Sequence, residues 1–283
     1  MREHLIRYSA VGPSRWLAWL PVIALGAVLA LLLTAEGWLS VLPWSILLFV
    51  FAFMSFRIRQ MRRFEQQVVH LQELSTLLNH REALRLSWTL LPRLSAVPEL
   101  HSRVVALVGH NLDQLRSYDA AIVAFEHLID RLPQEHPGSI QLRIQRTLAQ
   151  LATDQLTDAD EGLRRLRGFV ELEHPNPMGA AYRLAGLFQQ IRTHHWSDAV
   201  QGADRLLTQL RPLGIEAGYG HAMLALSFHH LNPAEHPAAP DQAALWWSRA
   251  TLLMPSVALI DRLPELSAIV EAGTASTAPS DDQ

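Results

Sequence analysis

The sequence contains no cysteine and no lysine. Without cysteine, disulfide bridges and thiolate metal sites are excluded. Without lysine, the chain has no amine for a Schiff base and no lysine for a phosphate-binding P-loop, and all 24 basic side chains are arginines. Enzyme classes that depend on these groups are therefore excluded.

Other catalytic signatures are missing as well, and the charge balance is slightly acidic. We find no HExxH motif, no glycine-rich phosphate loop and no GxSxG nucleophile turn. A formal net charge of −3 argues against binding driven by neutralisation of nucleic-acid phosphates. The sequence therefore predicts no catalytic residue, no cofactor and no nucleic-acid partner.

Charge is also missing from two long apolar runs near the N-terminus, residues 16–35 and 37–56. At about 1.5 Å per residue, a helix over each run is about 30 Å long, which is the thickness of a hydrocarbon core. We therefore expect two transmembrane helices within residues 16–56, in contact with the lipid bilayer. Because neither run contains an ionisable residue, the pair is typical of an anchor and not of a transport pathway.

Arginines flank the two runs on their outer sides. Three precede the first run, and four lie in a basic collar at residues 57–63. The positive-inside rule therefore places the short N-terminal segment 1–15 and everything after the second run in the cytoplasm. We expect an integral protein of a bacterial inner membrane with both termini on the cytoplasmic side.

The pattern from Phe64 onward is helical, with almost no strand signal. Apolar side chains recur at three- and four-residue steps as far as Leu78, and no glycine or proline interrupts the chain between Pro43 and this stretch. The second transmembrane helix is therefore expected to continue to about Leu78. Proline-bearing breaks divide the chain up to residue 271 into helices of ordinary length, and the small, polar segment 272–283 is predicted to be a disordered tail.

The stretch YDAAIVAFEHLIDRLPQEHP, at 118–137, carries a pattern that recurs later in the chain. Ala121 and Phe125 are followed by a proline, and Gly109 lies in the helix before them. This pattern resembles the second helix of a tetratricopeptide repeat (TPR), in which a small residue lets paired helices meet and an aromatic fills the gap between repeats. The packing positions that the resemblance assigns are Gly109, Tyr118, Ala121, Phe125, Trp196, Ala199, Ala243, Trp247 and Ala250.

The resemblance implies an all-α fold, with the N-terminal transmembrane helical hairpin followed by a TPR-like α-solenoid of about five helix pairs over residues 64–271. Arg116 stands where the family usually has glycine at the turn within a pair, and the spacing of the units wanders. An irregular all-α bundle therefore remains an alternative.

The tripeptide EHP occurs at 135–137, 173–175 and 235–237. We interpret its proline as the end of a helix and its histidine as a partner for the negative end of the helix dipole. Equivalent points along a solenoid do not converge on one ion, so no metal site is predicted. The acidic run 154–162 fails the spacing of a calcium-binding EF-hand, and we interpret Asp158 as the N-cap of a helix.

The resemblance also implies a groove, lined by the first helices of the pairs, in which the family binds peptides. Carrying the family register from Tyr118 and from the later first helix gives six candidate groove residues: Arg103, Ala106, His110, Asp113, Arg183 and Arg192. This mixture lacks the Lys/Asn pattern of the family members that clamp a C-terminal carboxylate, so that ligand is not implied.

The leading hypothesis is a membrane-anchored, TPR-like scaffold or assembly factor that binds a protein partner at the cytoplasmic face of the membrane. Two alternatives come from other classes. One is a membrane-bound, metal-dependent enzyme with a site among its His, Asp and Glu side chains. The other is an accessory subunit of a membrane transport complex.

Overall fold

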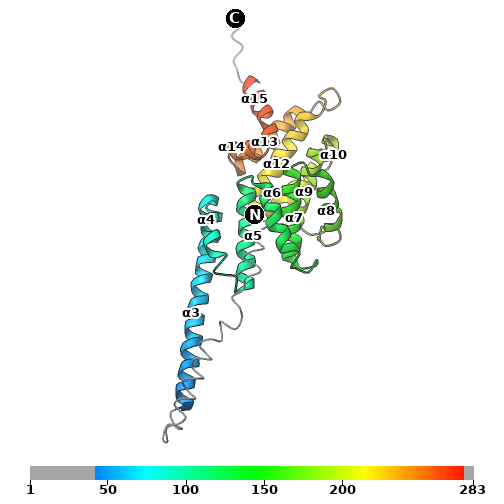
Figure 1. Ribbon diagram of the computed structural model, residues 1–283. Helices are drawn as coiled ribbons and strands as arrows, with labels where there is room; N and C mark the ends of the chain where they lie inside the picture. The colour runs from blue at the N-terminus through cyan, green and yellow to red at the C-terminus, as the bar shows by residue number, and fades with distance from the viewer. Residues whose placement is uncertain (1–41, 277–283) are drawn as a thin grey trace. The chain divides into compact units, whose positions relative to one another are not determined.

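The computed structural model describes residues 42–276, with side chains placed over 49–271, and the described part is entirely helical (Figure 1). The all-α prediction is confirmed for these residues. The predicted segment 1–15, the first transmembrane helix and residues 277–283 lie outside them. The helices are α3 (Leu42–Thr76), α4 (His80–Leu90), α5 (Pro98–Gln114), α6 (Tyr118–Ile129), α7 (Pro137–Ala152), α8 (Leu156–Leu166), α9 (Pro177–Arg192), α10 (Trp196–Val200), α11 (Ala203–Leu210), η2 (Arg211–Glu216), α12 (Ala217–His230), α13 (Ala239–Leu253), α14 (Ser256–Arg262), η3 (Pro264–Leu266) and α15 (Ser267–Ser276).

The chain forms two compact units, one ending at Leu128 and the other beginning at Ile129. Proline-bearing breaks separate α4 from α5, α6 from α7 and α8 from α9, whereas the turns between α3 and α4, α5 and α6, and α7 and α8 contain no proline. Pro98, Pro137 and Pro177 each begin a helix. The first helical residue needs no hydrogen bond from its backbone nitrogen, so proline costs least there.

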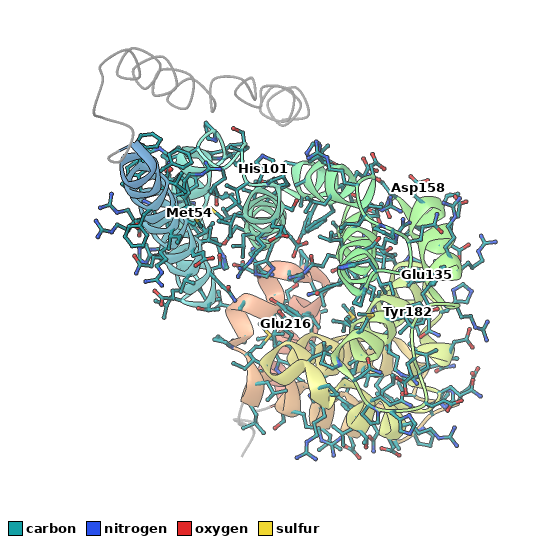
Figure 2. The ribbon with its side chains drawn as sticks, turned by 90° about the horizontal axis from the view of Figure 1, so that it is seen from below. Met54, His101, Glu135, Asp158, Tyr182 and Glu216 are labelled. Carbon is teal, nitrogen blue, oxygen red and sulfur yellow. The ribbon has the colours of Figure 1, made fainter. Side chains whose placement is uncertain are left out.

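The longest helix, α3, runs without interruption for 35 residues and ends at Thr76, close to the predicted end near Leu78. Its two parts differ in their surroundings. Phe51 is 72% exposed and Phe56 is 65% exposed, whereas Val68 and Leu71 are buried in the first unit. Met54, also exposed, lies on the uncovered part of the helix (Figure 2). A continuous helix thus joins an exposed apolar segment to a packed core.

Within residues 42–276, no single helix is both long and apolar enough to cross a membrane, although α13 and α14 together pass the same test as a pair bent by 107°.

Four helix pairs, α3/α4, α5/α6, α7/α8 and α9/α10, are joined by the same tight turn. Each turn has a non-glycine residue at positive φ: Leu78, Arg116, Asp154 and His194, which are 38, 38 and 40 residues apart. The backbone N–H of the residue that follows donates to the carbonyl five residues before it, at 2.9 Å in all four turns. This bond is the signature of a Schellman motif, which satisfies a carbonyl at the end of the first helix and reverses the chain.

A buried alanine follows each of these turns at the same distance. The side chains of Ala83, Ala121, Ala159 and Ala199 are at most 1% exposed, and each lies five residues after the positive-φ residue. Because each alanine is buried in close-packed surroundings, a larger side chain at its position would have to displace its neighbours. Turn and alanine together define a structural repeat of 38 to 40 residues.

The first unit is held by close packing and by a buried polar network. A Cβ atom added to Gly109 on α5 would lie 2.5 Å from Cε1 of Phe125 on α6, so the phenyl ring packs directly on the α5 backbone. Asn111 is fully buried and its amide donates to Ser75 Oγ of α3 at 2.8 Å. The Asn111 carbonyl oxygen also lies 2.8 Å from Nδ1 of His80, the first residue of α4. This network fixes α3, α4 and α5 in one register, since a shift would leave buried polar atoms unpaired.

In the second unit α9 contacts both α7 and α12, and α12 packs along α13. Ten of the 14 residues of α12 are buried, and a Cβ added to its Gly220 would lie 2.4 Å from Cδ1 of Leu210. The segment made of α14, η3 and α15 returns onto α12, where Leu263 and Leu266 are buried. Helix α15 continues to Ser276, into the segment predicted as a tail.

Two interpretations of helix ends are wrong. His136 does not follow a helix C-terminus but caps the N-terminus of α7, where its Nδ1 accepts from Gly138 N at 3.1 Å. Pro137 therefore begins the next helix, because α6 has already ended at Ile129. Likewise Asp158 is not an N-cap, because α8 begins at Leu156 and Asp158 lies in its first turn, near the positive end of the dipole.

Candidate binding surface

Four of the six predicted groove residues lie on one face of α5. Arg103 is exposed, and Ala106, His110 and Asp113 are half-buried. The ring of His110 meets that of His80 edge-on, with centroids 6.3 Å apart. Within the first unit, the groove positions are therefore a mixed charged and aromatic strip beside the start of α4.

The two predicted groove residues on α9 do not act together. They are nine residues apart, which places them on opposite sides of a helix. Arg183 donates to the carbonyl oxygen of Leu172 at 2.6 Å and so fastens the loop before α9. Arg192 donates to Asp154 at 3.0 Å through Nε and to Glu265 at 2.9 Å through Nη1. Both guanidinium groups are thus engaged within the second unit.

The ion pairs of Arg192 form one wall of a surface hollow of about 500 Å³, which also contains Trp196 and His230. A second hollow of about 400 Å³ is also lined by Trp196 and His230 and extends to His236. We call the combined feature the Trp196 cleft and define it by the residues at its centre: Asp154, Arg192, His194, Trp196, His230 and Glu265.

The aromatic rings of the Trp196 cleft are held in a fixed arrangement. The indole of Trp196 is stacked on His230, with centroids 4.4 Å apart and ring planes inclined by 17°. His194, in the positive-φ turn after α9, meets the indole edge at 5.3 Å. Because stacking limits the rotation of both side chains, the cleft presents rigid flat surfaces to a ligand at little conformational cost.

The surroundings of His230 favour its neutral form. Burial lowers the pKa of His230, the nearby His229 and His194 rings lower it further, and Glu265 acts in the opposite direction. A neutral imidazole has one donor and one acceptor nitrogen. The cleft can therefore hold an apolar or aromatic group against Trp196 and hydrogen-bond a polar group beside it, which suits recognition of a peptide side chain.

No group of three His, Cys, Asp or Glu side chains within the described residues is arranged to hold a metal ion. The first EHP histidine caps α7, and His174 of the second lies 2.8 Å from Glu171 Oε1. His236 of the third lines one hollow of the Trp196 cleft. The three tripeptides thus occupy different local environments and share no site.

The nine predicted packing positions vary in burial. Gly109, Ala121, Phe125, Ala199, Ala243 and Ala250 are buried, whereas Tyr118, Trp196 and Trp247 are half-buried. Beside Trp247, the ring of Trp246 is only 1% exposed and lies 5.4 Å from the His221 ring. In the fourth pair, Gly202 at φ 86° divides the second helix into α10 and α11, so Ala203 begins a new helix where the TPR pattern has an aromatic.

Several important residues are absent from the sequence-based set. Ala83 and Ala159 belong to the repeated alanine position, and an alignment at a 38-residue period would have found them. Glu265 pairs with Arg192 from 73 residues away, and no local pattern connects the two. His230 is half of an adjacent histidine pair that the sequence does not distinguish from chance.

Comparison with known proteins provides no relative to guide the assignment, since no family model, curated protein or solved structure matches this chain.

Proposed function

We propose that this protein is a membrane-anchored, TPR-like scaffold or assembly factor that binds a protein partner at the cytoplasmic face of a bacterial-type inner membrane. The observation that carries the proposal is the division of α3. Its first part exposes Phe51, Met54 and Phe56, four arginines follow within residues 57–63, and its last part is core. A helix of this kind is expected to leave a bilayer through the basic headgroup collar and enter a soluble domain directly.

The partner-binding part of the proposal is supported by repetition. Successive helix pairs with the same Schellman turn and the same buried alanine are the construction expected of a TPR-like solenoid. Helices α12 and α13 follow these four pairs as a fifth pair. Such folds bind other proteins through surfaces formed by several repeats. The Trp196 cleft joins the turn after α7, the turn after α9 and the end of α12, so it has this multi-repeat character.

The membrane part is tested by fusions and by fractionation. We expect a fluorescent protein fused after Gln283 to be bright and alkaline phosphatase fused there to be inactive, because the C-terminus is proposed to be cytoplasmic. The full chain should stay in the membrane pellet after alkaline carbonate extraction. An active alkaline phosphatase fusion, or release by carbonate, would contradict this part.

The partner part is tested by purification in mild detergent, followed by chemical cross-linking and mass spectrometry. We expect one protein to cross-link near the Trp196 cleft in the wild type. This cross-linked partner should be absent from Trp196→Ala and present with Trp88→Ala. The second variant is the control, because it also removes an exposed indole, but from α4. Recovery of no partner from the wild type, or equal recovery from both variants, counts against the scaffold proposal at this cleft.

A further inference from the structure

A second cavity in the second unit lies between α7 and α8 and is lined by positive charge. It measures about 150 Å³, and its walls include Gln134, Arg143, Arg146, Gly162, Arg165 and Phe169. Three guanidinium groups line this small cavity, and none of the residues that line it is acidic. It is separate from the Trp196 cleft, with which it shares no lining residue.

Gly162 lines this cavity at a point where α7 and α8 approach closely. A Cβ added to Gly162 on α8 would lie 2.8 Å from Oγ1 of Thr147 on α7, so only glycine leaves the helices this close. One turn before Thr147, Arg143 donates from Nε to Ser139 Oγ at 3.3 Å, which orients its guanidinium group. The arginine is therefore fixed from its own helix, and α8 brings Arg165 to the same cavity.

The arrangement has an electrostatic cost that a ligand would offset. Burial lowers the pKa of Arg143, and the neighbouring charges of Arg146 and Arg165 lower it further, against an opposing contribution from Asp130. Arg165 also contacts Glu161 on the exposed side of α8. Like charges brought together in a partly buried cavity repel one another, and an anion bound between them would offset that repulsion.

We infer that this cavity is a binding site for a phosphoryl group. A phosphate monoester carries a charge of about −1.5 to −2 at pH 7, which matches several guanidinium groups better than a single carboxylate does. Guanidinium groups bind phosphate oxygens through paired, charge-assisted hydrogen bonds. The cavity measures about 150 Å³, well below the roughly 300–1,000 Å³ of pockets that enclose a drug-sized ligand, so its size suits a small anionic group such as phosphoryl.

The rim of the cavity indicates how the source of the phosphoryl group can be distinguished. Phe169 is 42% exposed there, which provides an apolar surface next to the anion site. A free phosphate ion makes no use of that surface, whereas the organic part of a monoester can pack against it. Inorganic phosphate and phenyl phosphate are therefore suitable probes for the two sources.

The test is isothermal titration calorimetry on the full chain in detergent, in a buffer free of phosphate and sulfate. We expect both probes to bind, and Arg143→Gln and Arg165→Gln each to weaken binding about tenfold or more, as the loss of a charge-assisted hydrogen bond requires. The matched control is Arg164→Gln, because Arg164 makes the same i,i+4 contact with an acid as Arg165 does but does not line the cavity. The control should change binding less than about twofold, since only a screened surface charge is lost.

Tighter binding of phenyl phosphate that is lost in Phe169→Ala would identify a monoester as the ligand, and equal binding would identify the free ion. Both outcomes support the site. Because Arg165 is exposed, Arg165→Gln is expected to fold normally, which a thermal melt checks. Absence of binding at millimolar concentrations, or equal weakening by Arg164→Gln and Arg165→Gln, overturns the inference. Neither result bears on the proposed scaffold function, which is tested at another site.

Discussion

Backbone strain at Leu78 gives a sharp test of the repeated turn. Leu78 has φ 61°, and its side chain is 76% exposed, so it makes little packing contribution. Leucine in the left-handed region costs roughly 1–2 kcal/mol, whereas glycine adopts it freely. Glycine also makes the unfolded chain more flexible, which costs about 0.5–1 kcal/mol. We therefore expect Leu78→Gly to raise the free energy of unfolding by about 0.5–1 kcal/mol.

The adjacent residue provides the control. Leu77 is also 76% exposed but is not among the residues with positive φ, and its N–H donates to Glu73 O at 2.9 Å. Leu77→Gly has only the entropic cost and should lower the free energy of unfolding by about 0.5–1 kcal/mol. Urea unfolding followed by far-ultraviolet circular dichroism separates the two variants by midpoint. If both variants destabilise equally, the left-handed turn at Leu78 is refuted.

Three further predictions follow from packing, burial and charge. Gly109→Ala should lower the free energy of unfolding by about 1–3 kcal/mol, because the new methyl group overlaps Phe125; thermal unfolding measures the loss. Burial lowers the pKa of His221, so its contribution to stability is present above the unfolded-state pKa of about 6.5 and is lost as pH falls through the folded pKa. The thermal unfolding midpoint of the wild type should therefore fall between pH 7.5 and pH 5, and it should fall less in His221→Leu. Arg192→Met should lower the free energy of unfolding by about 0.5–1 kcal/mol, because it removes the ion pairs of Arg192 with Glu265 and Asp154. In 1 M salt, where the Debye length is about 3 Å, the difference from the wild type should be smaller, and paired urea titrations at the two salt concentrations measure it.

Periodicity in the sequence was enough to predict the helical class of the described residues. The spacing of Ala121 and Phe125 depends on contacts made between neighbouring helices, and such contacts recur at fixed steps along the chain. The uninterrupted helix past residue 56 was predictable for a similar reason, since no glycine or proline stands between residues 44 and 76. Local patterns therefore predict local geometry well here.

The site was less accessible to sequence reasoning because it depends on contacts between distant segments. Arg192 was assigned to an open groove, yet Glu265 and Asp154 already hold it. The helix starts at His136 and Leu156 were misjudged because several polar residues near each break can serve as a cap, and tertiary packing selects among them. The four left-handed turns carry Leu, Arg, Asp and His, none of which signals such a turn as glycine does.

The continuity of α3 also sets a mechanical property of the proposed anchor. From the exposed Phe56 to the buried Leu71 the helix rises about 22 Å, at about 1.5 Å per residue, with no glycine or proline between them. A disordered tether of the same number of residues would sweep a sphere of positions. In the proposed anchor, a continuous helix would instead hold the first repeat at a fixed distance from the bilayer and in a fixed orientation. Any protein docked on that repeat would be presented to its membrane neighbours in one orientation.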